Sequence, residues 1–133
     1  MSAVVTDTHA LIWYLFEPNL LSEQARSAFA TAEAEAGFIY VPTICVVEVR
    51  YLVDKVVLAE DVFDKLIASL LDASTAPKAI SLNLEIARCL QQIPKKQVPD
   101  MPDRIIAATA LHLNLPLITR DRKIRASAVE TVW

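Results

Sequence analysis

Four acidic residues stand where a carboxylate could do chemistry. Asp7 follows the apolar stretch AVVT, and Asp121 comes shortly after the apolar stretch PLIT. Glu48 interrupts the apolar helical pattern TICVVEVRYLVDK, and Asp103 opens the helical pattern DRIIAATALHL. Because a charge on an apolar surface is costly, such carboxylates are expected to be paired or to bind a cation.

A hard divalent cation would explain these acids together. Carboxylates that converge without a counter-charge repel one another and raise each other's pKa, and a bound cation removes that repulsion. Ligand sets made only of oxygen favour Mg²⁺ or Mn²⁺ over zinc. Such a cation generates a hydroxide nucleophile, orients a phosphate and neutralises developing charge, so the pattern indicates attack on a phosphodiester.

Each acid also has an ordinary structural explanation. Asp7, Asp103 and Asp121 are well placed to cap a helix or a turn. Glu48 could pair with an arginine, although Arg50 is a poor partner because residues two apart on a helix do not face each other. The metal hypothesis therefore depends on whether the fold brings the four acids together.

Other polar residues near these acids are candidates for secondary roles: Asp100, Thr8 and Thr119. Asp100 lies in the loop PKKQVPDMP, and each threonine carries a hydroxyl that could position a ligand or a water. For His9, packing against a helix or exposure at the surface is expected rather than a role as a base. Core packing is the first explanation for the aromatic cluster of Trp13, Tyr14 and Phe16, and a dimer or partner-protein groove is the alternative.

The net charge of −3 argues against a protein that holds a polyanion by overall charge alone. A bound cation or a local basic patch would have to help. Basic side chains beside Asp103 and Asp121 are candidates for contacts with a nucleic-acid backbone: Arg104, Arg120, Arg122 and Lys123. A solvated charge run is the more common explanation for such a segment.

Composition excludes several other classes of protein. The chain has 133 residues, 54% of them hydrophobic, which predicts one ordered domain over residues 1–133. Its single glycine, Gly37, rules out the glycine-rich loops of dinucleotide-binding and P-loop proteins. Cys45 and Cys89 are expected to be reduced core residues, and we expect no signal peptide, no membrane span and a cytoplasmic location.

Strands alternate with helices along the chain. The expected strands are AVVT (3–6), FIYVP (38–42), KAISL (78–82), PLIT (116–119) and a short one in AVETVW (128–133). The expected helices cover residues 8–16, 23–36, 43–55, 60–72, 83–92 and 103–113, with Ser22 and Thr43 as N-caps and Gly37 ending the second.

Because the strands are continuous apolar runs, they predict a parallel sheet with both faces covered. The expected fold is a three-layer α/β/α sandwich with a central, mostly parallel sheet of four or five strands. Ligands of such folds bind at the carboxyl ends of the strands, where Asp7 and Asp121 fall.

Four segments in this order resemble the PIN-domain family, and most of all the VapC-type toxins of prokaryotic toxin–antitoxin pairs: DTHALIWYL (7–15), VVEV (46–49), DMPDRIIAATAL (100–111) and LITRDRKI (117–124). The resemblance implies an endoribonuclease dependent on Mg²⁺ or Mn²⁺, with Asp7, Glu48, Asp103 and Asp121 as catalytic, metal-binding acids. It also implies an RNA substrate, products with 5′-phosphate and 3′-hydroxyl ends, an antitoxin partner and a homodimer. The family commonly has His-x-Asp-Pro before its third acid, whereas VPDMP (98–102) stands here, which weakens the case for Asp100.

Alternatives from other functional classes remain at this point. One is a PIN fold that binds RNA or protein without cleaving it. Another is a Mg²⁺-binding receiver-like signalling domain, which needs an aspartate after its third strand where Leu82 and Asn83 stand. A phosphatase of the haloacid-dehalogenase type needs Asp-x-Asp, but the second residue after Asp7 is His9.

Overall fold

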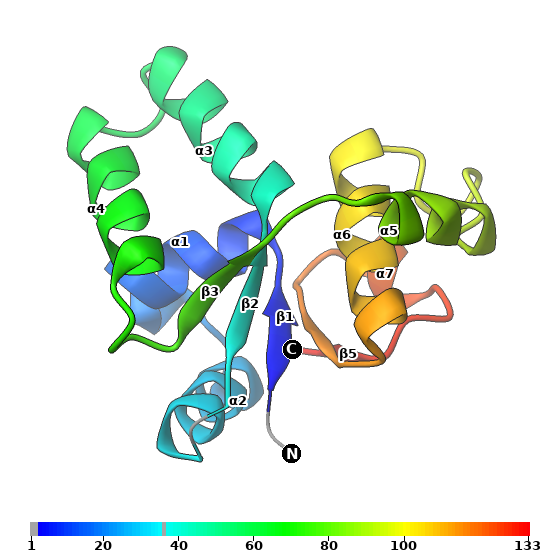
Figure 1. The fold of residues 1–133 in the computed structure, drawn as a ribbon, viewed down its shortest axis with the longest axis horizontal. Helices are drawn as coiled ribbons and strands as arrows, with labels where there is room; N and C mark the ends of the chain where they lie inside the picture. Colours follow the sequence, from blue (N-terminus) through cyan, green and yellow to red (C-terminus); the bar gives the residue numbers. More distant parts are fainter. Residues whose placement is uncertain (1–2, 36) are drawn as a thin grey trace.

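Five parallel strands form a central sheet within residues 3–35 and 37–133, the part of the chain that the computed structural model describes (Figure 1). They are β1 (Val4–Thr6), β2 (Ile39–Pro42), β3 (Pro77–Ile80), β4 (Leu117–Ile118) and β5 (Thr131–Val132), in the order β3-β2-β1-β4-β5. The predicted parallel sheet is confirmed. Receiver-type sheets have the order 2-1-3-4-5, so this order also separates the chain from a signalling receiver.

Helices cover both faces of this sheet (Figure 1). On one face lie α1 (Thr8–Phe16), α2 (Glu23–Ala34), α3 (Thr43–Asp54) and α4 (Glu60–Leu71), with the 3₁₀ turn η1 (Pro18–Leu20). On the other lie α5 (Leu84–Cys89), η2 (Leu90–Gln92), α6 (Met101–Leu113) and α7 (Arg122–Arg125). This division follows from right-handed crossovers between parallel strands, and it confirms the three-layer sandwich.

The alternation of side chains along each strand supplies both halves of the core. On one face, Val4 and Ile39 pack in the same buried cluster as Phe29 of α2. On the other, Val5 and Ile106 of α6 are fully buried in a second cluster. The central strands β1 and β4 therefore carry apolar residues on both sides, which explains why they are continuous apolar runs.

Helix starts agree with the sequence prediction at Ser22 and differ at Thr43. The Ser22 hydroxyl accepts a hydrogen bond from the amide of Ala25 at 3.1 Å, so Ser22 is the N-cap of α2. Thr43 is already the first residue of α3, and its hydroxyl accepts from the amide of Leu82 at 3.4 Å. The prediction that Thr43 caps this helix was wrong, because its hydroxyl ties α3 to the segment after β3 instead.

Segment ends differ by small amounts elsewhere. α2 ends at Ala34, and the predicted end at Ala36 lies outside the described residues. β4 is only two residues long, shorter than the predicted strand 116–119, and the hydroxyl of Thr119 after it accepts from the Asp121 amide. The last strand is likewise confined to Thr131–Val132.

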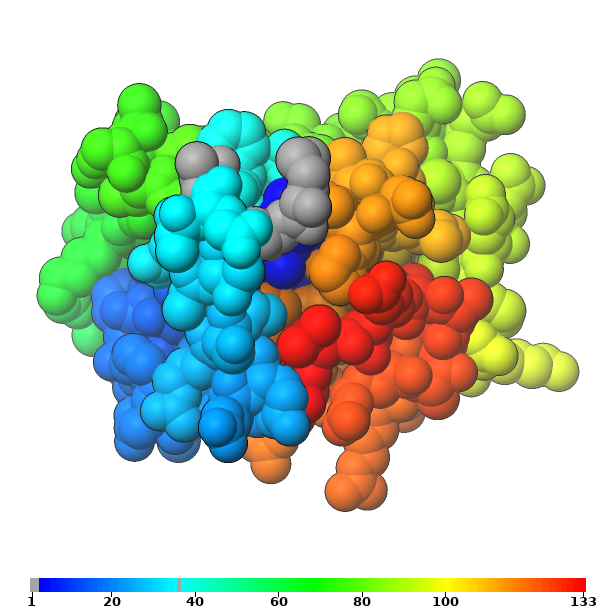
Figure 2. All heavy atoms as spheres, turned by 90° about the horizontal axis from the view of Figure 1, so that it is seen from below, coloured from blue at the N-terminus to red at the C-terminus, as the bar shows by residue number. Residues whose placement is uncertain are grey.

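The amino ends of the strands form the face opposite the candidate site described below. Figure 2 shows this face, on which α2 and the C-terminal segment lie side by side. Cys45 is buried and Cys89 half-buried, and both are free thiols. In the described part of the chain, every helix is too short or too polar to cross a membrane.

Candidate active site

A cavity of about 610 Å³ opens at the carboxyl ends of the central strands. Helices α1, α3 and α6 begin at this end of the sheet (Figure 1). Its lining residues are Asp7, Thr8, His9, Trp13, Glu48, Asp100, Asp103, Arg120 and Asp121. The fold thus brings together all four acids that the sequence singled out, although more than a hundred residues separate the first from the last.

Asp7 is the most deeply placed of the acids. It follows β1 directly, is only 9% exposed, and accepts a hydrogen bond from the amide of Ala10 at 2.9 Å. Burial raises the pKa of Asp7, and hydrogen bonds from Thr119 and Ala10 offset part of that effect. The helix-cap role and the site role coexist, because one carboxylate oxygen caps α1 and the group still lines the cavity.

Glu48 reaches the cavity from α3 and is held by Thr8. The Thr8 hydroxyl donates to Glu48 Oε1 at 2.6 Å, which links the start of α1 to α3. Arg50 is not its partner, since its guanidinium lies 2.7 Å from Asp54 and 2.7 Å from Glu60.

The apolar stripe predicted around Glu48 is not the buried face of α3. Cys45, Val49 and Val53 are buried, whereas Val47 is 48% and Tyr51 62% exposed. Glu48 therefore lies at the border between the buried and exposed faces, because α3 packs its other side on the sheet. Its carboxylate is only partly removed from water, so a high cost of burial is not what marks it as functional.

Asp100, and not Asp103, is the N-cap of α6, so the carboxylate of Asp103 remains available to line the cavity. Helix α6 begins at Met101, two residues earlier than predicted, because the Asp100 carboxylate accepts from the Asp103 amide at 3.2 Å. Burial raises the pKa of Asp103 to about 7, with further contributions from the negative charges of Asp100, Asp121, Glu48 and Asp7. The acids therefore interact electrostatically.

Replacing Asp100 with alanine is expected to lower the free energy of unfolding by about 1 kcal/mol, because the variant loses the N-cap of α6. Asparagine at the same position keeps an oxygen that accepts from the Asp103 amide, so Asp100→Asn should stay close to wild type. Urea unfolding of both variants tests this. Equal losses of stability in the two variants would show that charge, and not capping, is what Asp100 contributes.

Asp121 and Thr119 close the site on the side of β4. One Asp121 carboxylate oxygen accepts from the amides of Lys123 at 2.8 Å and Ile124 at 3.0 Å, and so caps α7. Thr119 is fully buried, and its hydroxyl accepts from the Asp121 amide at 3.0 Å. Thr119 also lowers the pKa of Asp7, so it influences two of the acids.

Of the four basic candidates, Arg120 alone lines the cavity, with its guanidinium carbon 5.9 Å from the centre of the Trp13 ring. Arg104 points elsewhere: its guanidinium donates to the carbonyl of Leu90 at 2.7 Å and to that of Ile93 at 2.9 and 3.2 Å. Arg104 therefore holds the loop before α6, and its expected contact with a nucleic-acid backbone does not suit this arrangement. The remaining two lie exposed on α7, next to Asp121: Arg122 and Lys123.

The four acids line the same cavity, but their carboxylates do not converge on a single point. Among residues 3–35 and 37–133, no group of three or more His, Cys, Asp or Glu side chains is gathered closely enough to hold a metal ion by itself. The donor chemistry nevertheless suits Mg²⁺, because this ion prefers oxygen ligands, keeps several of its waters and needs few direct protein ligands. These residues fit a hydrated cation better than a fully enclosed one.

Two cavity residues were not predicted as part of the site. Trp13 had been expected in the core or at an interface, and His9 in packing or at the surface, yet both line the cavity. Their spacing of four residues on α1 places them on the same side of the helix, one turn apart. Because both residues follow Asp7 on the same helix, this spacing could have indicated from the sequence that the two rings lie near that acid.

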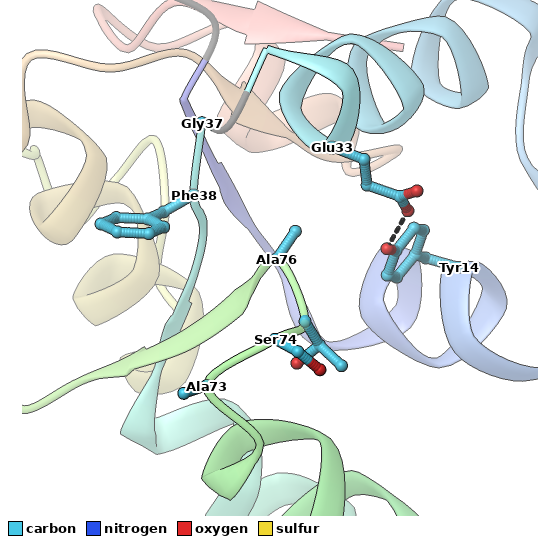
Figure 3. Close-up of a pocket in the computed structure, with 8 residues that line it drawn as sticks. Tyr14, Glu33, Gly37, Phe38, Ala73, Ser74 and Ala76 are labelled. Carbon is cyan, nitrogen blue, oxygen red and sulfur yellow. Dashed lines mark hydrogen bonds between the residues drawn. The ribbon is translucent and has the colours of Figure 1, made fainter.

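A second cavity, of about 540 Å³, lies at the opposite edge of the sheet, before β2 and β3 (Figure 3). The hydroxyl of Tyr14 donates to Glu33 there, tying α1 to α2, and Tyr14 stacks on Phe29 with ring centres 4.5 Å apart. Glu33 is the one acid of this lining, which otherwise consists of small and aromatic residues. Of these two cavities, the first is the one that combines several acids with strand ends.

The fold and the first cavity together define a class of protein: a parallel α/β/α sandwich with an acidic cavity at the carboxyl ends of its sheet. Within that class, the chain belongs to the PIN domain family, whose sequence model matches residues 4–130. The resemblance inferred from the four sequence segments is confirmed.

Individual relatives match along the whole chain. "Ribonuclease VapC22" of Mycobacterium tuberculosis (strain ATCC 25618 / H37Rv) is 28% identical over 138 residues, covering 100% of both chains. A structure of VapBC2 from Rickettsia felis bound to a promoter DNA fragment has a TM-score of 0.73 at 15% identity, covering 97% of this chain and 96% of that one. A toxin–antitoxin complex from Klebsiella pneumoniae has a TM-score of 0.66 at 23% identity, covering 98% and 97%. At these identities the two structures establish the shared fold.

Proposed function

We propose that this protein is a single-domain, divalent-metal-dependent endoribonuclease and the toxin of a toxin–antitoxin pair. One observation carries the proposal: four acids, positioned after β1, on α3, on α6 and after β4, line one cavity. Burial, together with the charges of the neighbouring acids, raises the pKa of Asp103 to about 7. The name of the ribonuclease relative and the toxin–antitoxin complex among the similar structures support the same assignment.

Asp7, Glu48, Asp103 and Asp121 would hold the cation, in part through its water shell. When bound, Mg²⁺ or Mn²⁺ activates a water and neutralises charge on the phosphate. The Thr8 hydroxyl, 2.6 Å from Glu48, keeps that carboxylate aimed at the cavity. The buried Thr119 favours the ionised form of Asp7, because it lowers the pKa of that carboxyl.

Phosphate binding falls to other features of the same cavity. A carboxylate beside the cation would take the proton of the attacking water. Arg120 at the cavity and the basic residues of α7 supply positive charge for an RNA backbone, which the chain as a whole lacks. Cleavage would leave 5′-phosphate and 3′-hydroxyl ends.

A protein partner has a suitable surface next to the acids. A mainly apolar cavity of about 310 Å³ adjoins Glu48, and its apolar residues are Ile44, Val47, Tyr51, Leu52, Met101 and Pro102. Exposed apolar surface beside a charged site is typical of an interface. We assign it to a segment of the antitoxin, and we further propose a homodimer acting in the cytoplasm, where the RNA substrate and the antitoxin would be found.

The proposed activity is tested by incubating the purified chain with transfer and messenger RNA in Mg²⁺ and mapping the ends of the products. Discrete fragments with 5′-phosphate ends are expected, and EDTA should abolish them until excess Mg²⁺ or Mn²⁺ is added. Cleavage that persists in EDTA would refute metal dependence. RNA binding without cleavage in any divalent cation would instead identify a PIN fold that only binds.

A further inference from the structure

One wall of the acidic cavity is built from two aromatic rings and a guanidinium: His9, Trp13 and Arg120, here called the aromatic wall. The ring centres of His9 and Trp13 lie 5.9 Å apart and tilted by 49°, and the Arg120 guanidinium carbon is 5.9 Å from the Trp13 ring centre. All three line the same cavity as the acids.

Core packing accounts for only part of Trp13. Its ring contacts Trp133 at 5.8 Å between centres and packs against both apolar clusters, but the side chain is only half-buried. His9 is exposed one turn earlier on α1. Core packing therefore does not explain why these two rings line a charged cavity.

Charge decides from which side a polyanion can enter. The five acids of the lining would repel phosphates that no cation neutralises: Asp7, Glu48, Asp100, Asp103 and Asp121. Arg120 lies on the aromatic wall, and three further basic residues follow it on α7: Arg122, Lys123 and Arg125. An RNA backbone is therefore drawn along this wall.

We propose that the aromatic wall is a nucleobase subsite, in which an unpaired base next to the scissile phosphate stacks on Trp13 and His9 while Arg120 contacts the adjoining phosphate. The inference rests on the proposed function, because it takes the scissile phosphate to lie at the acids. Proteins that bind single-stranded nucleic acid combine aromatic platforms with a basic groove in this way. Bases held in a duplex cannot use such a platform, so the ligand is a single-stranded segment of RNA.

Binding can be tested without cleavage, using tryptophan fluorescence. The chain has two tryptophans, so Trp133→Phe leaves Trp13 as the only one. In that variant, with Asp7→Asn added to block cleavage, a short single-stranded RNA should quench the fluorescence of Trp13 to saturation, and a duplex of the same sequence should not. Saturable binding without any change in Trp13 fluorescence would overturn the subsite.

Substitutions then measure what the wall contributes. Trp13→Leu should weaken binding of the single strand by roughly 5- to 100-fold, the range found for loss of one stacking partner. Trp13→Phe should retain much of the affinity, and His9→Ala should show a smaller loss. Phe38→Leu is the matched control, because Phe38 is 44% exposed at the start of β2, away from the acids, and should leave affinity unchanged. Equal affinity of the Trp13→Leu variant and wild type would refute the proposal.

An abasic scan of the substrate needs no variant that could misfold. In Mg²⁺, wild-type protein is given oligonucleotides that lack one base at a time around the mapped cleavage position. A loss of at least about fivefold in kcat/KM at a neighbouring position is expected, and Trp13→Leu should remove that dependence. A flat scan on RNA that is cleaved would reject the subsite alone, whereas no cleavage of any RNA would reject the proposed function.

Discussion

Replacing Asp7 with asparagine should abolish RNA cleavage and leave the fold intact. We expect the rate to fall at least about a hundredfold, a loss of ~2.7 kcal/mol of transition-state stabilisation, because the variant loses the most buried of the four acids. Asparagine keeps an oxygen that accepts from the Ala10 amide, and it is a good N-cap. Burial raises the pKa of Asp7, so removing its charge should make the metal-free protein at least as stable as wild type.

The alanine variant separates the two roles of this residue. Asp7→Ala should lose cleavage equally, but it should also lose about 1 kcal/mol of stability with the cap of α1. Cleavage assays in Mg²⁺ and urea unfolding in EDTA, run on both variants, measure the two effects. Substantial cleavage by Asp7→Asn, or a stability loss as large as that of Asp7→Ala, would mean that Asp7 is mainly structural.

Much of the fold could be predicted from the sequence because most of the strands are recognisable as continuous apolar runs. Runs such as FIYVP are apolar throughout, and that pattern is typical of strands covered on both faces. What failed were details decided by side-chain hydrogen bonds between distant segments. Thr43 looks like an N-cap in the sequence, yet its hydroxyl accepts from Leu82, 39 residues away.

The acidic cavity could be predicted because strand ends are common to one edge of a parallel sheet. Asp7 and Asp121 follow strands, so topology alone brings them together. The position of Glu48 was predicted for an incorrect reason, since the stripe it interrupts is largely exposed. Which face of α3 points toward the core depends on how this helix crosses the sheet. The periodicity of an almost wholly apolar helix does not decide between its faces.

Partners of individual side chains were beyond sequence reasoning. Arg104 and Arg120 both stand beside an acid in the sequence, but the first bonds to loop carbonyls and the second lines the cavity. Trp13 was assigned to packing because aromatic residues at helical spacing usually are core residues. Its second environment, at the cavity, exists only once the fold brings Arg120 and Trp133 to its ring.

Without metal, the protein should lose stability as the pH rises between about 4 and 7. Asp103 has a folded-state pKa of about 7 against an ordinary value of 3.8. In that window the folded protein keeps a proton that the unfolded chain has released, so the free energy of unfolding falls until Asp103 is fully ionised. Since Asp103 is partly exposed, we expect a difference of about 1–2 kcal/mol, below the full value for such a shift.

A divalent cation should reverse this pH dependence, because it binds the ionised acids. Urea unfolding in EDTA at about pH 5 and about pH 8 should show the more acidic sample to be more stable, whereas saturating Mg²⁺ should stabilise the sample at about pH 8 far more. Asp103→Asn has no such carboxyl, so its stability in EDTA should vary less with pH. The contradicting outcome is a free energy of unfolding of wild type in EDTA that stays constant or rises over this pH window. Either result would contradict a raised pKa for Asp103, which rests on its burial and on the charges of the neighbouring acids, and would remove the electrostatic support for a cation among them.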